Sequence, residues 1–188
     1  LVKDPEFVKK AYAGGVPMGG DLPPKPAGAK APRFAVWALK DPESGNLDRI
    51  QVIKGWYKGG YGWEKIYDVA LSDGRSPDPD TGEVPPVGNT VDVANARYTN
   101  SIGDSQLAVV WTDPDFDPSL HAVYYVRVIE IPTPRWSTYD AKALGRPIPE
   151  GLPASIQERA WSSPIWYTPD PKLVSKPRYY PGLRKEVP

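Results

Sequence analysis

The sequence predicts a mainly all-β protein, an antiparallel two-sheet β-sandwich with long loops rich in proline and glycine and short helical pieces. About six short segments combine β-branched and aromatic residues with alternating apolar and polar side chains, which is typical of half-buried strands. Helical periodicity is weak and strands do not alternate with helices, so a parallel sheet is not expected. Proline (24 residues) and glycine (17 residues) predict much irregular chain, while 7 tryptophans and 11 tyrosines indicate an ordered core.

Three regions follow from the order of these patterns along the chain. Residues 1–32 are expected to form a short helix, with Asp4 as N-cap and Pro5 at the first helical position, and then an irregular arm. Residues 33–168 contain the alternating segments and are expected to form the β-sandwich domain. Residues 169–188 are rich in proline and lysine and are expected to be an extended C-terminal tail.

Alternation within the sandwich region fixes the expected strands. In the segment 47–56 (LDRIQVIKGW) it places Ile50 in the core and Lys54 on the outside. A glycine-rich loop at 57–62 then leads into the next strand of a hairpin meander. The other strands are expected at 33–39, 63–71, 106–112, 121–131 and 163–168, with a long loop at 72–90 and a helical turn near 137–144 in the proline-punctuated segment 132–160.

Composition excludes several classes of function. Lysine and arginine (23 residues) balance aspartate and glutamate (23 residues), so nothing attracts the chain to phosphate over long range, and a nucleic-acid partner is not expected. No stretch approaches the ~18 apolar residues of a membrane span. The absence of cysteine excludes thiolate metal sites. The single histidine, His121, cannot build a histidine-rich metal site, and no Gly-x-Ser-x-Gly elbow accompanies it, so it is expected at a strand edge.

One acidic segment raises the question of a calcium site. Asp113, Asp115 and Asp117 have the spacing of the first ligands in a calcium loop. Pro118 stands where that loop requires glycine, which favours ordinary turns made by the aspartate side chains. The segment 78–83 (DPDTGE) offers the same alternatives more weakly.

An aromatic cluster suggests a binding surface. Trp56, Tyr57, Tyr61 and Trp63 surround a glycine-rich turn, with Lys54, Lys58 and Lys65 as basic neighbours. Such rings stack on a sugar ring or a base, so a carbohydrate-binding module is the alternative function. The other interpretation is that the rings cap the sheet or pack against a neighbouring domain.

Several co-linear segments together resemble the C-terminal part of a bacterial family described only as a domain of unknown function. Longer members of that family carry a metal-dependent hydrolase barrel similar to the PHP (polymerase and histidinol phosphatase) domains. The resemblance spans roughly residues 1–169. It is carried by the segments VPMGGDL (16–22), LDRIQVIKGW (47–56), VGNTVDV (87–93), WTDPDFDP (111–118), YYVRVIEIPTPRW (124–136) and QERAWSSPIWYTP (157–169).

The resemblance implies a non-catalytic accessory domain, part of a larger protein, whose partner is the barrel of its own polypeptide. The divalent metals that attack a phosphate or sulfate ester would belong to the barrel, and no cofactor is expected in this chain. Arg135 and Trp136 follow a strong strand, which holds a loop rigidly, and are the candidates for one wall of the barrel's cleft. Related proteins are often exported, which implies a periplasmic or secreted location.

Overall fold

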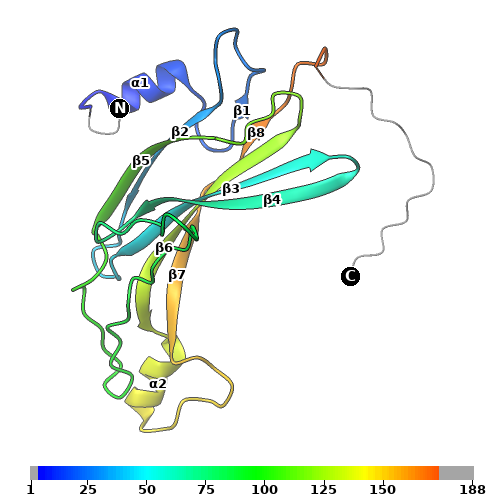
Figure 1. Ribbon diagram of the computed structural model, residues 1–188. Helices are drawn as coiled ribbons and strands as arrows, with labels where there is room; N and C mark the ends of the chain where they lie inside the picture. Colours follow the sequence, from blue (N-terminus) through cyan, green and yellow to red (C-terminus); the bar gives the residue numbers. More distant parts are fainter. Residues whose placement is uncertain (1–3, 174–188) are drawn as a thin grey trace.

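The computed structural model describes residues 4–173 and confirms the mainly β fold with two sheets (Figure 1). Two short helices and eight strands make up the described chain. Their bounds are α1 (Phe7–Gly14), β1 (Asp21–Leu22), β2 (Arg33–Leu39), β3 (Leu47–Lys58), β4 (Tyr61–Leu71), β5 (Gln106–Thr112), β6 (Ala122–Pro134), α2 (Trp136–Leu144), β7 (Ser155–Trp161) and β8 (Ile165–Tyr167).

The larger sheet contains six strands in the order β1-β8-β6-β3-β4, with β7 also paired to β6. β6 is long enough to pair with β8 near its start, at Ala122–Tyr124, and with β7 from Arg127 onward. β2 and β5 form the second sheet, a two-stranded antiparallel pair. The pairs are antiparallel, as expected, except that β1 lies parallel to β8. Through β1, the N-terminal region contributes to the large sheet.

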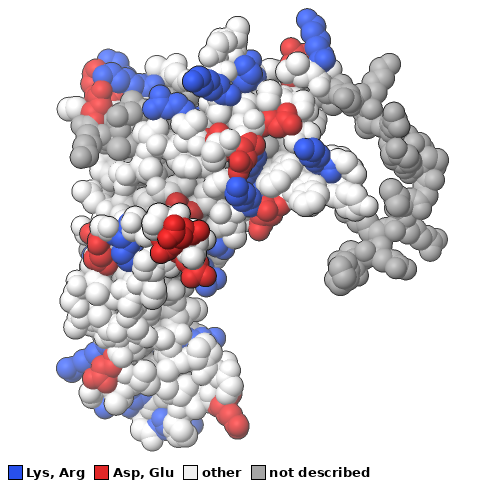
Figure 2. Space-filling view, viewed as in Figure 1, with Lys and Arg blue, Asp and Glu red and all other residues white. Residues whose placement is uncertain are grey.

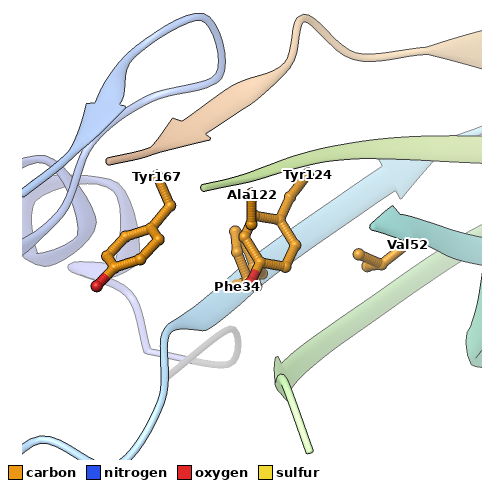
Figure 3. Close-up of a cluster of buried hydrophobic side chains, with 5 residues drawn as sticks. All are labelled: Phe34, Val52, Ala122, Tyr124 and Tyr167. Carbon is orange, nitrogen blue, oxygen red and sulfur yellow. The ribbon is translucent and has the colours of Figure 1, made fainter. Parts of the chain in front are cut away.

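The hydrophobic core lies between the two sheets (Figure 3). The ring of Phe34, from β2, packs 4.6 Å from the ring of Tyr124, from β6, and Val52, Ala122 and Tyr167 complete the cluster. Burying each large side chain contributes about 1.5–3 kcal/mol. The small sheet therefore covers one face of the large sheet, which makes the arrangement a sandwich.

A long hairpin formed by β3 and β4 projects from the body of the molecule (Figure 1). Its turn is Gly59-Gly60, with φ of 64° and 92°. Two successive positive φ angles are what a type I′ turn requires, and glycine adopts them without strain. The loop expected at 57–62 is therefore too long, because β3 continues to Lys58 and β4 begins at Tyr61.

Two strands, β1 and β7, were not predicted. β7 (SIQERAW) lies in the segment expected to be proline-punctuated loop. The polar residues at the centre of β7 break the alternation that predicts a strand, and one of them makes structural hydrogen bonds. The side-chain amide of Gln157 donates to Asp48 Oδ2 (3.0 Å) and to the Glu130 carbonyl (2.8 Å).

The long loop after β4 is tied to the large sheet through Arg75. Arg75 Nη2 donates to Asp48 Oδ1 (2.5 Å) and to the Asp48 carbonyl (2.7 Å), while Nη1 donates to the Pro85 carbonyl (2.8 Å). The Asp48 side chain is buried, and a buried carboxylate is stable only when paired. The segment 72–90 is thus anchored to the sheet near its start, while most of its residues are exposed.

The two predicted helical pieces are present, although their ends differ from expectation. α1 begins at Phe7, and the Asp4 carboxylate accepts a hydrogen bond from the Glu6 backbone (2.8 Å). α2 ends at Leu144, and the next residue, Gly145, has φ of 61°. Within residues 4–173, neither helix has the length and apolar character needed to cross a membrane. The predicted tail at 169–188 lies largely outside the described residues.

Candidate functional site

The β3–β4 hairpin divides the predicted aromatic cluster between two faces. Trp56 and Trp63 are direct cross-strand partners, so they share a face, and their ring planes differ by only 14° with centroids 6.5 Å apart. Tyr61 pairs with Lys58 and, by strand alternation, lies on the same face. Tyr57 pairs with Gly62 and lies on the opposite face. The structure thus assembles three of the four predicted rings, here named the aromatic platform (Trp56, Tyr61 and Trp63).

The aromatic platform is exposed at its outer end. Trp63 is 53% exposed and Tyr61 is 64% exposed, while Trp56, nearer the core, is half-buried. The indole of Trp63 donates to the Lys58 carbonyl (3.3 Å), which fixes the ring to the hairpin backbone. Figure 2 shows the projecting hairpin as mostly uncharged surface, with positive and negative side chains interspersed over the neighbouring body.

A buried ion pair lies beneath the platform, and the sequence did not predict it. Lys54 was expected to face outward, but it follows Val52 on the core side of β3, and its side chain is 5% exposed. Its ammonium lies 2.6 Å from Asp113 Oδ2 and donates to the Asp115 carbonyl (2.7 Å). The same ammonium is 5.5 Å from the Trp56 ring centroid, within cation–π range. The lysine therefore joins the platform to the loop after β5.

Tyr124 completes this buried cluster. Its hydroxyl donates to Asp113 Oδ2 (2.7 Å). Burial, and then this hydrogen bond to a carboxylate, raise the pKa of the Tyr124 phenol well above its usual value. The phenol is therefore a permanent donor near neutral pH.

The three aspartates considered for calcium are held by other partners. Asp115 Oδ2 accepts hydrogen bonds from Lys65 Nζ (2.5 Å) and the Tyr67 hydroxyl (2.7 Å), and the lysine in particular lowers the pKa of Asp115. Asp117 Oδ1 accepts from the hydroxyl (2.6 Å) and backbone (2.9 Å) of Ser119, which lowers the pKa of Asp117.

The described chain brings no three histidine, cysteine, aspartate or glutamate side chains together as a metal site. In the weaker candidate segment, Asp78 Oδ1 accepts from the backbone of Asp80 (2.9 Å) and of Thr81 (2.8 Å), as in an ordinary turn. His121 is exposed and precedes β6 directly, with its carbonyl accepting from the Tyr57 backbone (3.2 Å). The hydrogen bonds of Asp78 and His121 stabilise a turn and the start of β6.

A small recess adjoins Trp56. It has a volume of about 30 Å³ and is walled by Trp56, Phe116, Leu120 and Ala122, with the side of Lys54 and two acidic residues, Asp115 and Asp117. The volume is that of a single small group such as hydroxymethyl or water. The lining of the recess is mainly apolar and includes two acidic residues.

Arg135 and Trp136 lie at the other end of the molecule, where β6 passes into α2 (Figure 1). The Arg135 guanidinium carbon is 5.3 Å from the Trp136 ring centroid, a cation–π contact, and Nη1 is 3.4 Å from Ser137 Oγ. Trp136 is largely exposed. Arg135 is half-buried and Trp136 faces solvent, and the role of the pair in a cleft wall stays a prediction.

The large sheet has a second face, on the side away from β2 and β5. Strand register places both apolar and polar side chains on it, and the apolar ones together with Arg127 are here named the outer face. Trp161 is 58% exposed and Trp166 is 51% exposed, and Arg127 Nε donates to Gln51 Oε1 (2.8 Å) beside them. The outer face consists of Ile53, Ile66, Val123, Tyr125, Arg127, Trp161 and Trp166. The polar residues Gln51, Glu64, Asp68 and Arg159 lie on the same side of the sheet.

Comparison with known proteins identifies one family. A family described as "Protein of unknown function (DUF3604)" matches residues 1–169. The chain belongs to this family. No curated protein and no solved structure matches it.

The match to DUF3604 runs through every strand of the fold. It includes the aromatic platform, the loop with the three aspartates and the outer face, and it ends just beyond β8. These features therefore lie within the DUF3604 region itself. Aromatic rings, carboxylates and an exposed sheet face are groups through which a protein can bind a ligand or another domain.

Proposed function

We propose that this chain is a non-catalytic accessory β-domain of a larger, PHP-like metal-dependent hydrolase, and that its outer face packs against the hydrolase barrel. The observation that carries this proposal is the exposed apolar character of a rigid sheet. Trp161, Trp166 and Ile66 are each about half exposed on one face. Large apolar side chains exposed together on one face are typical of an interaction site.

The chemistry of the outer face suits contact between domains. Interfaces between domains bury about 600–1,500 Å² and tolerate polar groups among apolar ones. Arg127 is already held by Gln51, so its guanidinium is presented in a fixed position beside the Trp161 ring, its partner in register. Tryptophan and arginine are the residues that contribute most to such interfaces.

The position of Arg135 and Trp136 adds a consequence. They follow the same strand, β6, that carries Tyr125 and Arg127 on the outer face. A barrel docked on that face would bring its rim toward the start of α2. We propose that the pair then forms part of the cleft wall, where a guanidinium would attract an anionic ester. The barrel would hold the divalent metals, and the setting would be periplasmic or secreted.

Side-chain footprinting tests the docking directly. Hydroxyl radicals would oxidise tryptophans in the 188-residue chain and in the native polypeptide that carries it, followed by peptide mass spectrometry. Trp161 and Trp166 are expected to react several-fold more slowly in the native polypeptide because the barrel covers them. Trp63, on the other face of the sheet, is the internal control and keeps its reactivity. Equal oxidation of Trp161 and Trp166 in both samples would contradict the proposal.

An activity assay tests the non-catalytic part. The isolated chain is expected to hydrolyse neither p-nitrophenyl phosphate nor p-nitrophenyl sulfate with Mg²⁺, Mn²⁺ or Zn²⁺. Turnover that co-purifies with the chain and survives a second, independent purification would refute it.

A further inference from the structure

The aromatic platform has a composition that selects one class of ligand. Its two outer rings, Tyr61 and Trp63, are 64% and 53% exposed, on a hairpin that projects from the body (Figure 1). A two-glycine turn and the cross-strand Trp56–Trp63 pair hold the rings without any contact from a second domain. Rings held in this way lose little side-chain entropy when a ligand stacks on them.

Ring spacing decides how a ligand would lie. A sugar ring placed between two aromatic rings needs two van der Waals contacts of about 3.5–4 Å, hence at least about 7 Å between the planes. The centroids of Trp56 and Trp63 are 6.5 Å apart. A ligand therefore lies on the exposed surface of the platform and does not enter between the rings.

Charge around the platform is balanced in number. Lys54 is paired with Asp113 (2.6 Å) and Lys65 with Asp115 (2.5 Å). Hydrogen bonds from Ser119 lower the pKa of Asp117, and the charges of Lys58 and Lys54 lower it further. Three lysines and three aspartates leave no net charge around the platform, which removes the attraction that an anionic polymer requires.

Hydrogen-bonding groups lie beside the rings. Among residues 4–173, Asp115 Oδ1 and Asp117 Oδ2 accept no hydrogen bond from the protein, while the other oxygen of each carboxylate is engaged. Both residues line the recess of about 30 Å³ next to Trp56. Carboxylate oxygens accept strong hydrogen bonds from hydroxyl groups, and the recess has room for one hydroxymethyl group.

From these observations we infer that the aromatic platform is a binding site for a neutral glycan. One hexose stacks its apolar face on Trp63 and Tyr61. Its exocyclic hydroxymethyl group enters the recess beside Trp56, where its single hydroxyl donates to Asp115 or to Asp117. This inference does not depend on the proposed docking, because the platform and the outer face lie on opposite faces of the large sheet.

The hairpin supplies its own matched control. Trp63 and Tyr57 are both exposed residues of the hairpin, 53% and 58%, but they face opposite ways. Native affinity electrophoresis would compare the wild-type chain with Trp63→Ala and Tyr57→Ala in gels containing hydroxyethylcellulose, glycogen or galactomannan. Gels with polygalacturonate or heparin, and a labelled oligo-dT, would serve as anionic probes.

The wild type is expected to be retarded by at least one neutral polysaccharide and by none of the anionic probes. Trp63→Ala is expected to weaken that retardation about tenfold or more, while Tyr57→Ala leaves it unchanged. Circular dichroism would confirm that both variants are folded, and Trp63→Phe, which keeps a ring, is expected to retain part of the binding. No retardation by any neutral polysaccharide, retardation only by an anionic probe, or equal loss in both alanine variants would overturn the inference.

Discussion

The buried pair of Lys54 and Asp113 gives the sharpest test of the physical account. The two side chains are 5% and 0% exposed, and their charged atoms are 2.6 Å apart. Replacing Asp113 by alanine leaves the Lys54 ammonium with the Asp115 carbonyl and takes the acceptor from the Tyr124 hydroxyl. An uncompensated buried charge costs about 3–5 kcal/mol. Replacing Lys54 by methionine costs less, about 2–3 kcal/mol, because Asp113 keeps hydrogen bonds from Tyr124 and from the Asp115 backbone.

Urea denaturation followed by tryptophan fluorescence measures these free energies of unfolding. Asp113→Ala is expected to lower the midpoint at unchanged slope, and to lower Tm by roughly 6–20 °C. The double variant Lys54→Met/Asp113→Ala is expected to lose about 1–3 kcal/mol less than the sum of the single variants, because it leaves no unpaired charge. Single losses below about 1 kcal/mol, or simple additivity, would refute the reasoning.

Three further predictions follow from particular residues. Folding raises the pKa of the Tyr124 phenol, so the stability that this phenol contributes is complete below its unfolded pKa of about 10 and is lost as the pH rises above that value. Over that range the urea midpoint of the wild type should fall more steeply than the midpoint of Tyr124→Phe. Parallel curves for the two proteins would contradict this. Gly103 has φ of 75°, and an added Cβ would lie 2.6 Å from Ile131, so Gly103→Ala is expected to lower the free energy of unfolding by about 2–4 kcal/mol. Gly82 has φ of 73° but nothing within 4 Å of an added Cβ, so Gly82→Ala is expected to lower it by only about 1 kcal/mol. Since lysines hold Asp113 and Asp115, thermal melts with Ca²⁺ and with EDTA should coincide, and a Tm that falls with EDTA would restore the calcium hypothesis.

Much of the fold could be predicted because alternation is a local signal. Arg33–Leu39 and Gln106–Thr112 were predicted with the bounds that the structure has, since each buries every second residue against the large sheet. β7 was not predicted because its centre is polar. Gln157 in that centre donates a hydrogen bond to Asp48, which is more than 100 positions away in the sequence. β1 is two residues long and has no pattern of its own.

The candidate site was predicted only in part, because residue type and alternation are local signals and some of its contacts are not local. The aromatic residues were recognised by type, but assigning Tyr57 to their platform depended on a loop that is really a two-glycine turn. The Gly59-Gly60 dipeptide is itself a hairpin signal, and with it the alternation separates Tyr57 from Trp56. The Lys54–Asp113 pair joins positions 59 residues apart and has no local signature. One clue was available, since Lys54 has the same parity as Ile50 and Val52 along β3.

The outer face shows a different limit. Its members come from β3, β4, β6, β7 and β8, and only the strand order brings them together. Sequence alternation shows which residues share a face within one strand, but not which strands are neighbours. The pairing of β7 and β8 with β6 is therefore what places Trp161 and Trp166 on the same face of the sheet.

The central claim is that this chain is one domain of a larger hydrolase. Intact mass spectrometry of the native protein, purified from its source with an antibody against the 188-residue chain, tests it most directly. The account predicts a polypeptide far heavier than the 20.7 kDa of this chain, with a barrel preceding the sequence described. A native mass of 20.7 kDa would contradict it.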